Sequence, residues 1–258
     1  MTNKPREYHT TLTIKDALRL KLKFFDNPAA RVISPIGDAG AFATKSRQSP
    51  RGLVYVASPG CSGSSFLHDA IGLAPASCVI FKTHSFWTMF KGVPCIKSTT
   101  SGGNMWQVEP DDKVIYVYAH PMNVLLGCYS KIDNDYARNW INGNPHWSAW
   151  LEADLDQDFY DTWLSKDVLN LERHLDKWWK HQDKFNILCL KYESLFEHGD
   201  VINNFLGFPI SLPAKKERST NWLNSPHKEA MSKTYAALIE KYEQRPDYEI
   251  FRRSENDL

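Results

Sequence analysis

Residues 53–69 read LVYVASPGCSGSSFLHD and join an apolar run to a turn of small residues and the start of a helix. Leu53 to Ala57 is the kind of short apolar stretch that forms a fully buried strand. Small residues at 62–65 let the backbone turn tightly around an anion, and helical spacing begins at Phe66. Unpaired N–H groups at a helix N-terminus favour negative charge. This order of strand, turn and helix predicts phosphate binding. An ordinary strand-to-helix turn of an α/β protein explains the loop alone equally well.

The spacing of this loop excludes two common nucleotide motifs. It lacks GxxxxGK[ST], so no lysine follows the glycines to reach a β- or γ-phosphate, and it lacks the GxGxxG of dinucleotide folds. Cys61 in such a loop would have a lowered pKa and suggests a phosphatase nucleophile. The Cys-x5-Arg spacing of those enzymes is absent, which disfavours that hypothesis.

Composition and charge limit the classes of protein that the chain can belong to. The chain has 258 residues, enough for one ample domain, and a net charge of +1, so no global field recruits nucleic acid. Five widely spaced cysteines show no metal-ligand pattern, so we expect reduced thiols, a cytoplasmic location and no metal. No apolar run approaches the length of a membrane span, and no signal peptide opens the sequence.

Alternating strand and helix patterns predict the fold class. We expect further strands at 77–81, 113–118 and 186–191, and helices at 123–131, 168–182, 201–206 and 228–242. This order favours an α/β fold with a central, mostly parallel β-sheet flanked by helices on both faces. Residues 1–50 are interpreted as an N-terminal arm packed on a single domain at 51–258. Loops are expected across 91–112, and a frayed tail after Pro246.

Four motifs, in order, carry a resemblance to a known family. Gly60–Leu67 resembles the 5′-phosphosulfate loop of sulfotransferases, and Lys82-Thr83-His84 is similar to the KTH motif of the same family. Residues 114–130, VIYVYAHPMNVLLGCYS, look like the family's IYVxRNPxDxxxSxYS, and residues 215–222, KKERSTNW, fall in step with its RKGxxGDW. The resemblance covers about residues 53–242 and implies the P-loop NTPase-like sulfotransferase fold.

The resemblance also implies an activity and a site. The chain would move a sulfuryl group from 3′-phosphoadenosine 5′-phosphosulfate (PAPS) to a hydroxyl or amine by in-line displacement, leaving 3′-phosphoadenosine 5′-phosphate (PAP). His84 would be the general base, and Lys82 would neutralise sulfonate charge. The implied nucleotide-binding residues are Gly60, Cys61, Ser62, Gly63, Ser64, Ser65, Phe66, Tyr192, Lys215, Lys216 and Arg218. A core role for Tyr192, and a solvated basic loop at 215–218, are equally ordinary interpretations.

Departures from the family pattern support a second hypothesis. Cys61 stands where the family loop has Lys or Arg, and Ala119, Asn123 and Gly127 replace the Arg, Asp and Ser of the third motif. Charge-assisted hydrogen bonds are worth roughly 1.5–3 kcal/mol each, so losing the loop cation together with the Arg and the Ser of the third motif would cost on the order of 4–9 kcal/mol. The alternative is therefore a catalytically weak or inactive relative that binds a nucleotide, an anion or a protein partner through the same cleft.

The acceptor is the least defined part of the prediction. Trp140, Trp147 and Trp150 lie in an acidic, tryptophan-rich segment where the family builds part of its acceptor pocket. They are candidates for contact with a sugar or another small acceptor, and core packing is the alternative. Nothing in the sequence indicates an oligomeric state.

Overall fold

The structure is a computed structural model that describes residues 53–74, 79–84, 87–90, 93–97, 105–130, 164, 167, 169–180, 182–215 and 221–253. The predicted arm at 1–50, the tryptophans at 140, 147 and 150, and the basic residues Lys216 and Arg218 lie outside these ranges. The expected division of the chain at residue 50 therefore stays a prediction.

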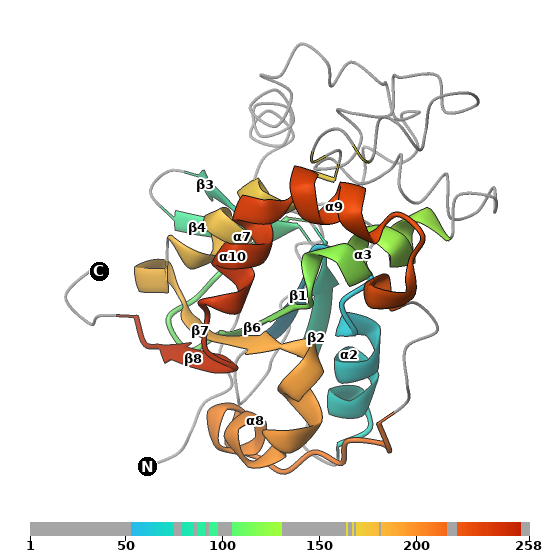
Figure 1. Cartoon of the computed structure of the whole chain (residues 1–258). Coiled ribbons are helices and arrows are strands. Elements are labelled where there is room, and N and C mark those ends of the chain that lie inside the picture. The colour runs from blue at the N-terminus through green and yellow to red at the C-terminus, as the bar shows by residue number, and fades with distance from the viewer. Residues whose placement is uncertain are drawn as a thin grey trace, which may run out of the picture.

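A five-stranded sheet forms the centre of the molecule (Figure 1). Its strands, in the order in which they lie side by side, are β2 (Val79–Thr83), β1 (Leu53–Ala57), β6 (Lys113–Tyr118), β7 (Asn186–Lys191) and β8 (Tyr248–Phe251). The pairs β2–β1, β1–β6 and β6–β7 are parallel, and β7–β8 is antiparallel. Every residue of β1 is buried because both faces of the sheet are covered.

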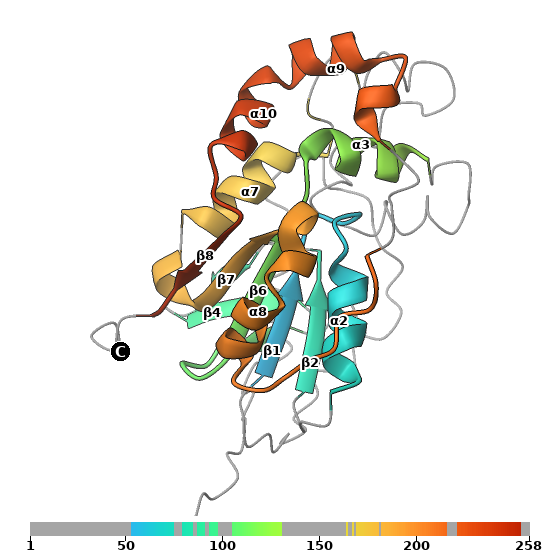
Figure 2. The same cartoon turned by 60° about the horizontal axis from the view of Figure 1, so that its bottom comes forward.

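Helices cover both faces of the sheet, as the sequence predicts (Figures 1 and 2). On one face, α2 (Ser64–Gly72) and α8 (Gly199–Leu206) pack their apolar residues on β1, β6 and β7. The opposite face carries α3 (Pro121–Tyr129), α7 (Leu171–Trp179), α9 (Lys228–Thr234) and α10 (Ala236–Glu243). The fold is therefore α/β, with a mostly parallel sheet between two helical layers.

A second, smaller sheet corrects the expectation of loops across 91–112. It contains β3 (Thr88–Phe90), β4 (Val93–Lys97) and β5 (Met105–Gln107) in antiparallel order. Trp106 of β5 stacks on Phe81 of β2 at 4.7 Å between ring centroids, so this sheet adds to the core on the α7 side. Its strands have three to five residues, which is too short for a clear alternating pattern in the sequence.

The C-terminal region contains two further corrections. The tail expected to fray after Pro246 instead forms β8, because the backbone of β7 pairs with it from Ile187 to Leu190. The single helix expected at 228–242 is two helices that meet at Tyr235, a buried residue with non-helical backbone angles. Both features depend on contacts with distant segments, which local pattern does not report.

The strand order places the loop after β1 at a switch point. From β1 the chain passes through α2 to β2 on one side, whereas β6 lies on the other side of β1. Ligands of open α/β sheets bind at the carboxyl ends of strands where the order reverses in this way. The turn between β1 and α2 is therefore the expected ligand site of this sheet. Among the described residues, no helix has the length and apolarity needed to cross a membrane.

Candidate active site

The loop between β1 and α2 presents backbone N–H groups at the helix N-terminus. Gly60, Cys61 and Gly63 have φ values of 93°, 50° and 80°, so three left-handed residues turn the chain within four positions. Gly63 caps α2 without a side-chain hydrogen bond. Within the described part of the chain, no group accepts from the N–H groups of Ser64, Ser65 and Phe66, while Leu67 N–H donates to the Gly63 carbonyl. Such a terminus suits an anion.

His84 lies against this loop and is held by Ser58, the residue that follows β1. The Nδ1 atom of His84 is 2.9 Å from the Ser58 Oγ atom and 3.2 Å from the Ser58 carbonyl oxygen. Because a carbonyl only accepts, Nδ1 carries the proton, and the lone pair of the neutral ring is on Nε2. The imidazole is 3% exposed.

Ser58 joins this imidazole to the start of α2. Its hydroxyl donates to the Ser64 Oγ atom at 2.8 Å and accepts from the Gly60 N–H at 3.2 Å. The hydroxyl of Ser62 donates to the Gly60 carbonyl at 2.8 Å, so it stabilises the turn itself. The loop and the histidine therefore form one hydrogen-bonded unit.

Lys82 brings a positive charge to the same terminus. It lies on β2, two residues before His84, and its Nζ atom donates to the Ser65 hydroxyl in the first turn of α2. Cys61 occupies the loop position that holds a cation in the sulfotransferase motif. The cation at the start of α2 thus comes from the neighbouring strand, close to the backbone N–H groups of the first turn.

Tyr192 lies directly on the loop from the other side. A Cβ atom built on Gly63 would be 2.1 Å from the Tyr192 Cε2 atom, so the ring occupies the space that a side chain would need. Phe196 packs near both aromatic residues, at 5.1 Å from Phe66 and 6.2 Å from Tyr192 between ring centroids. The structure therefore brings both predicted aromatic residues to the loop, and the role of Phe66 in nucleotide binding stays a prediction.

The segment that resembles the 3′-phosphate motif offers no charged side chain at the three changed positions. Ala119 is buried, and Asn123 accepts a hydrogen bond from Trp222 N–H at 3.1 Å. A Cβ atom on Gly127 would lie 3.3 Å from the Cβ atom of Cys61, so the cysteine covers the glycine.

The basic run is only partly described. The Nζ atom of Lys215 donates to the Glu193 carbonyl at 3.3 Å and forms an ion pair with Glu197 at 3.8 Å. These contacts place Lys215 on η2 (Tyr192–Glu197), the 3-10 turn that carries Tyr192. Lys216 and Arg218 stay predictions outside the described residues.

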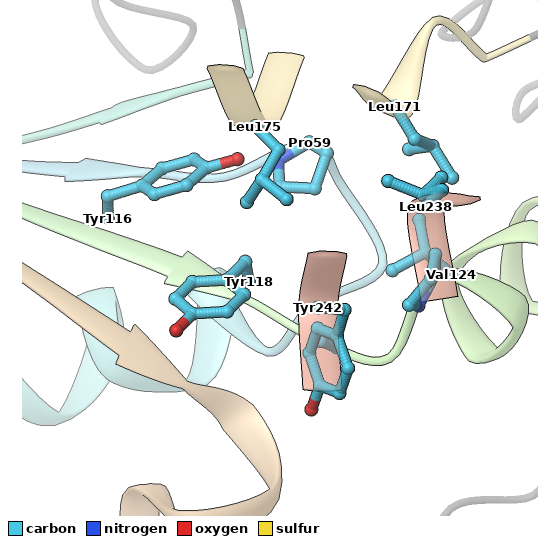
Figure 3. Close-up of a pocket in the computed structure, with 10 residues that line it drawn as sticks. Pro59, Tyr116, Tyr118, Val124, Leu171, Leu175, Leu238 and Tyr242 are labelled. Atoms are coloured by element: carbon cyan, nitrogen blue, oxygen red, sulfur yellow. The ribbon is translucent and has the colours of Figure 1, made fainter. Parts of the chain in front are cut away.

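An apolar pocket borders the loop at Pro59 (Figure 3). Its empty space, with the open solvent at its mouth included, is about 290 Å³. Its walls come from the ends of β1 and β6 and from α3, α7 and α10, and the lining residues are Pro59, Tyr116, Tyr118, Ala119, Pro121, Val124, Leu171, Leu175, Leu238 and Tyr242. The hydroxyls of Tyr118 and Tyr242 donate to the Pro246 carbonyl and the Glu193 carboxylate, so their rings supply apolar wall.

Sequence reasoning missed two polar residues at this site. Ser58 is buried at the end of β1, and its role depends on a partner 26 positions away. His174 is fully buried on α7 and hydrogen-bonds to Tyr116. A histidine in the apolar stripe of an otherwise charged helix was the available signal. In the described residues, no group of three or more potential metal ligands is found.

No protein-family model and no curated protein matches the sequence. Among solved structures, the chain is similar to mouse sulfotransferase SULT7A1 complexed with PAP. The two share 14% sequence identity, the match covers 74% of this chain and 89% of that chain, and the TM-score is 0.42. A likeness of this size says nothing about substrate or activity.

Proposed function

We propose that this protein transfers a sulfuryl group from PAPS to an acceptor hydroxyl or amine, with His84 as the general base. The observation that carries the proposal is the contact between His84 Nδ1 and Ser58 at the loop after β1. It joins a histidine in a defined tautomer to a loop whose backbone N–H groups suit an anion. The sulfotransferase-like motifs of the sequence favour PAPS as the anion.

The tautomer of His84 supports its role as a base. With the Nδ1 proton directed to Ser58, Nε2 is the atom that takes the proton from the acceptor. As the proton moves to Nε2, the acceptor oxygen or nitrogen forms a bond to sulfur. The bond between sulfur and the bridging oxygen of the 5′-phosphate breaks, and its electron pair leaves with PAP.

The transfer also requires groups that stabilise the negative charge on the leaving phosphate. The N–H groups of Ser64, Ser65 and Phe66 and the ammonium of Lys82 lie at the start of α2 and would stabilise this charge. Fixed donors of this kind stabilise charge that develops in the transition state. We propose that Lys82 replaces the cation that the loop lacks at Cys61. The apolar pocket at Pro59 would receive an apolar portion of the acceptor.

The contacts along α3 favour a second candidate function. Ala119 and Gly127 carry no polar side chain, and Asn123 is bonded to Trp222. A protein of this kind would bind a nucleotide or another anion at the loop and turn it over slowly or not at all. Binding without transfer is the behaviour that distinguishes this candidate from the enzyme.

Two measurements test both candidate functions. The first is calorimetric titration with PAP, and the second is transfer of radiolabelled sulfate from PAPS to a panel of phenols, alcohols, amines and sugars. The enzyme predicts micromolar binding that Lys82→Met weakens by about ten- to a hundredfold, since a charge-assisted contact is lost. His84→Gln is expected to retain PAP affinity within about threefold and to abolish transfer. Lys180→Met, which removes an exposed charge at the C-terminal cap of α7, is the matched control.

Each result favours one conclusion. Binding with transfer supports the enzyme, and binding without transfer to any acceptor supports the second candidate. Absence of binding at millimolar PAP would defeat the enzyme and would leave, of the second candidate, only the binding of an anion other than this nucleotide. Transfer that survives in His84→Gln would remove His84 as the base while leaving the nucleotide site intact.

A further inference from the structure

The side chain of Ser58 makes three polar contacts at the end of β1. Its Oγ atom is 2.9 Å from the His84 Nδ1 atom, 2.8 Å from the Ser64 Oγ atom and 3.2 Å from the Gly60 backbone nitrogen. Ser58, Ser64 and His84 are all buried. Because each buried donor needs an acceptor, the direction of every contact in this group can be worked out.

Two N–H groups approach the Ser58 oxygen and fix the direction of its own proton. A backbone N–H only donates, so Gly60 uses one lone pair of the hydroxyl. The His84 Nδ1 atom also lies 3.2 Å from the Ser58 carbonyl oxygen, which only accepts, so Nδ1 shares its proton between the carbonyl and the hydroxyl. Both lone pairs of the Ser58 hydroxyl are then used, and its single proton goes to Ser64.

Ser64 accepts this proton, so its own hydroxyl proton can go to another acceptor. Among the described residues, no group accepts it. Ser64 is the first residue of α2, where the N–H groups of the first turn also have no acceptor in the described part of the chain. The hydroxyl and these N–H groups can therefore donate to the same anion.

We propose that Ser58 and Ser64 couple the anion loop to His84, with Ser58 as a positioning residue for the base. The inference rests on the proposed function in taking His84 as the base. An anion that accepts from the Ser64 hydroxyl makes the Ser64 oxygen a stronger acceptor, and the Ser58 oxygen becomes a stronger acceptor in turn. The proton on His84 Nδ1 is then held more firmly, and the Nε2 lone pair stays directed to its task. No proton passes through the two serines.

NMR of the His84 imidazole measures this coupling without relying on turnover. The probes are PAP and, in a separate titration, inorganic phosphate, at a pH at which the ¹⁵N shifts show a neutral ring. The Nδ1 proton of His84 is assigned by its loss in His84→Gln. Its ¹H shift moves downfield as its hydrogen bond strengthens, so the change on adding each probe reports the coupling.

Four variants separate the chain of hydroxyls from other effects of the anion. Ser58→Ala and Ser64→Ala each interrupt the chain and keep the backbone N–H groups of the loop, so either one decides if the other fails to fold. Ser64→Thr keeps a hydroxyl at the same position. Ser194→Ala is the matched control, since it removes a buried serine hydroxyl that donates to the Lys191 carbonyl.

We expect both probes to move the His84 Nδ1 proton downfield in wild type, in Ser64→Thr and in Ser194→Ala. In Ser58→Ala and Ser64→Ala the change should fall to less than about a third of the wild-type value, because only the through-space field of the anion remains. Absence of a response to both probes in wild type overturns the inference. A full response in Ser58→Ala or in Ser64→Ala overturns it as well.

Kinetics separate this inference from the proposed function. In an active enzyme, Ser58→Ala should lower kcat by at least about tenfold with KM for PAPS within about threefold, since misorientation of a base acts on the chemical step. An unchanged kcat in Ser58→Ala would contradict the positioning role. If wild type transfers no sulfate while the Nδ1 proton still responds to phosphate through the two serines, the proposed function fails and the coupling stands.

Discussion

The side chain of Cys61 covers Gly127. A Cβ atom built on Gly127 would lie 3.3 Å from the Cys61 Cβ atom and 3.8 Å from its Sγ atom. Cys61 has a φ of 50°, a left-handed backbone conformation that residues other than glycine, asparagine and aspartate rarely adopt. The loop and α3 therefore meet through a cysteine in an unfavourable backbone conformation and a glycine in a helix.

This contact predicts that the two positions are energetically coupled. Gly127→Ala alone should gain little stability, because the gain of up to about 1 kcal/mol from alanine in a helix is offset by crowding at Cys61. In a Cys61→Gly background the obstacle is absent, and the same change should stabilise by about 1 kcal/mol. Urea unfolding of the four proteins measures the coupling. Strict additivity would show that the contact is loose.

Recognition of the 3′-phosphate is expected to depend on the basic run at 215–218. The described positions Ala119, Asn123 and Gly127 offer no charged group to it. We predict that PAP binds more tightly than AMP and that Lys216→Ala with Arg218→Ala reduces this advantage by at least about tenfold, because charge-assisted contacts are lost. Calorimetry with both nucleotides gives the ratio. Glu240→Ala, an exposed change on α10, is the control, and an unaltered ratio in the double variant would contradict the assignment.

The sheet was predictable where strands are buried on both faces. Three strands have a continuous apolar centre and were predicted with their observed bounds: Leu53–Ala57, Lys113–Tyr118 and Asn186–Lys191. The edge strand Tyr248–Phe251 was not, because it alternates between exposed and half-buried residues and is flanked by charges. Its position depends on pairing with β7, a contact that local pattern does not contain.

The site was predictable to the extent that its residues are close in sequence. The small residues at 60–65 indicated a tight turn before a helix, and the motif at 82–84 indicated a histidine, which lies against that turn. The contact of Cys61 with Gly127 and the approach of Tyr192 to Gly63 join segments that are distant in the chain. Such packing depends on the fold, so it became visible only with the structure.

Gly63 is predicted to tolerate no side chain. An alanine there would place its Cβ atom 2.1 Å from the ring of Tyr192, at a backbone φ of 80°. The left-handed conformation costs about 1 kcal/mol and overpacking a further 1–3 kcal/mol, so Gly63→Ala should destabilise by roughly 2–4 kcal/mol. Thermal unfolding measures this change.

A second variant separates the two causes. Gly63→Ala combined with Tyr192→Ala removes the overlap and leaves the backbone cost, so the double variant should recover part of the cost when it is compared with Tyr192→Ala alone. Gly72→Ala is the matched control, because its Cβ atom would meet only the far end of Ile80, at 3.9 Å. If Gly63→Ala lowers the free energy of unfolding equally in wild type and in Tyr192→Ala, the Tyr192 ring moves aside at no cost.

The buried carboxyl group of Asp112, which lies away from the candidate active site, is expected to make the stability of the protein depend on pH. Its carboxylate is fully buried at the opposite edge of the sheet and accepts from Leu53 N–H at 2.7 Å and Glu109 N–H at 2.8 Å. Burial raises its pKa from 3.8 to about 7, against the two N–H donors, which lower it. The folded protein therefore holds this proton more tightly than the unfolded chain, and the contribution to stability is lost as pH rises through about 7.

The sign of this effect can be measured against Asp112→Asn, which cannot titrate. Relative to that variant, wild type should lose on the order of 2–3 kcal/mol of unfolding free energy between about pH 5 and pH 8. Glu240→Gln, at an exposed position on α10, should keep the wild-type pH dependence. Parallel curves for wild type and Asp112→Asn would mean that the two N–H donors outweigh burial. The carboxylate would then be ionised throughout this range, and its two hydrogen bonds would fix the start of β1 at every pH tested.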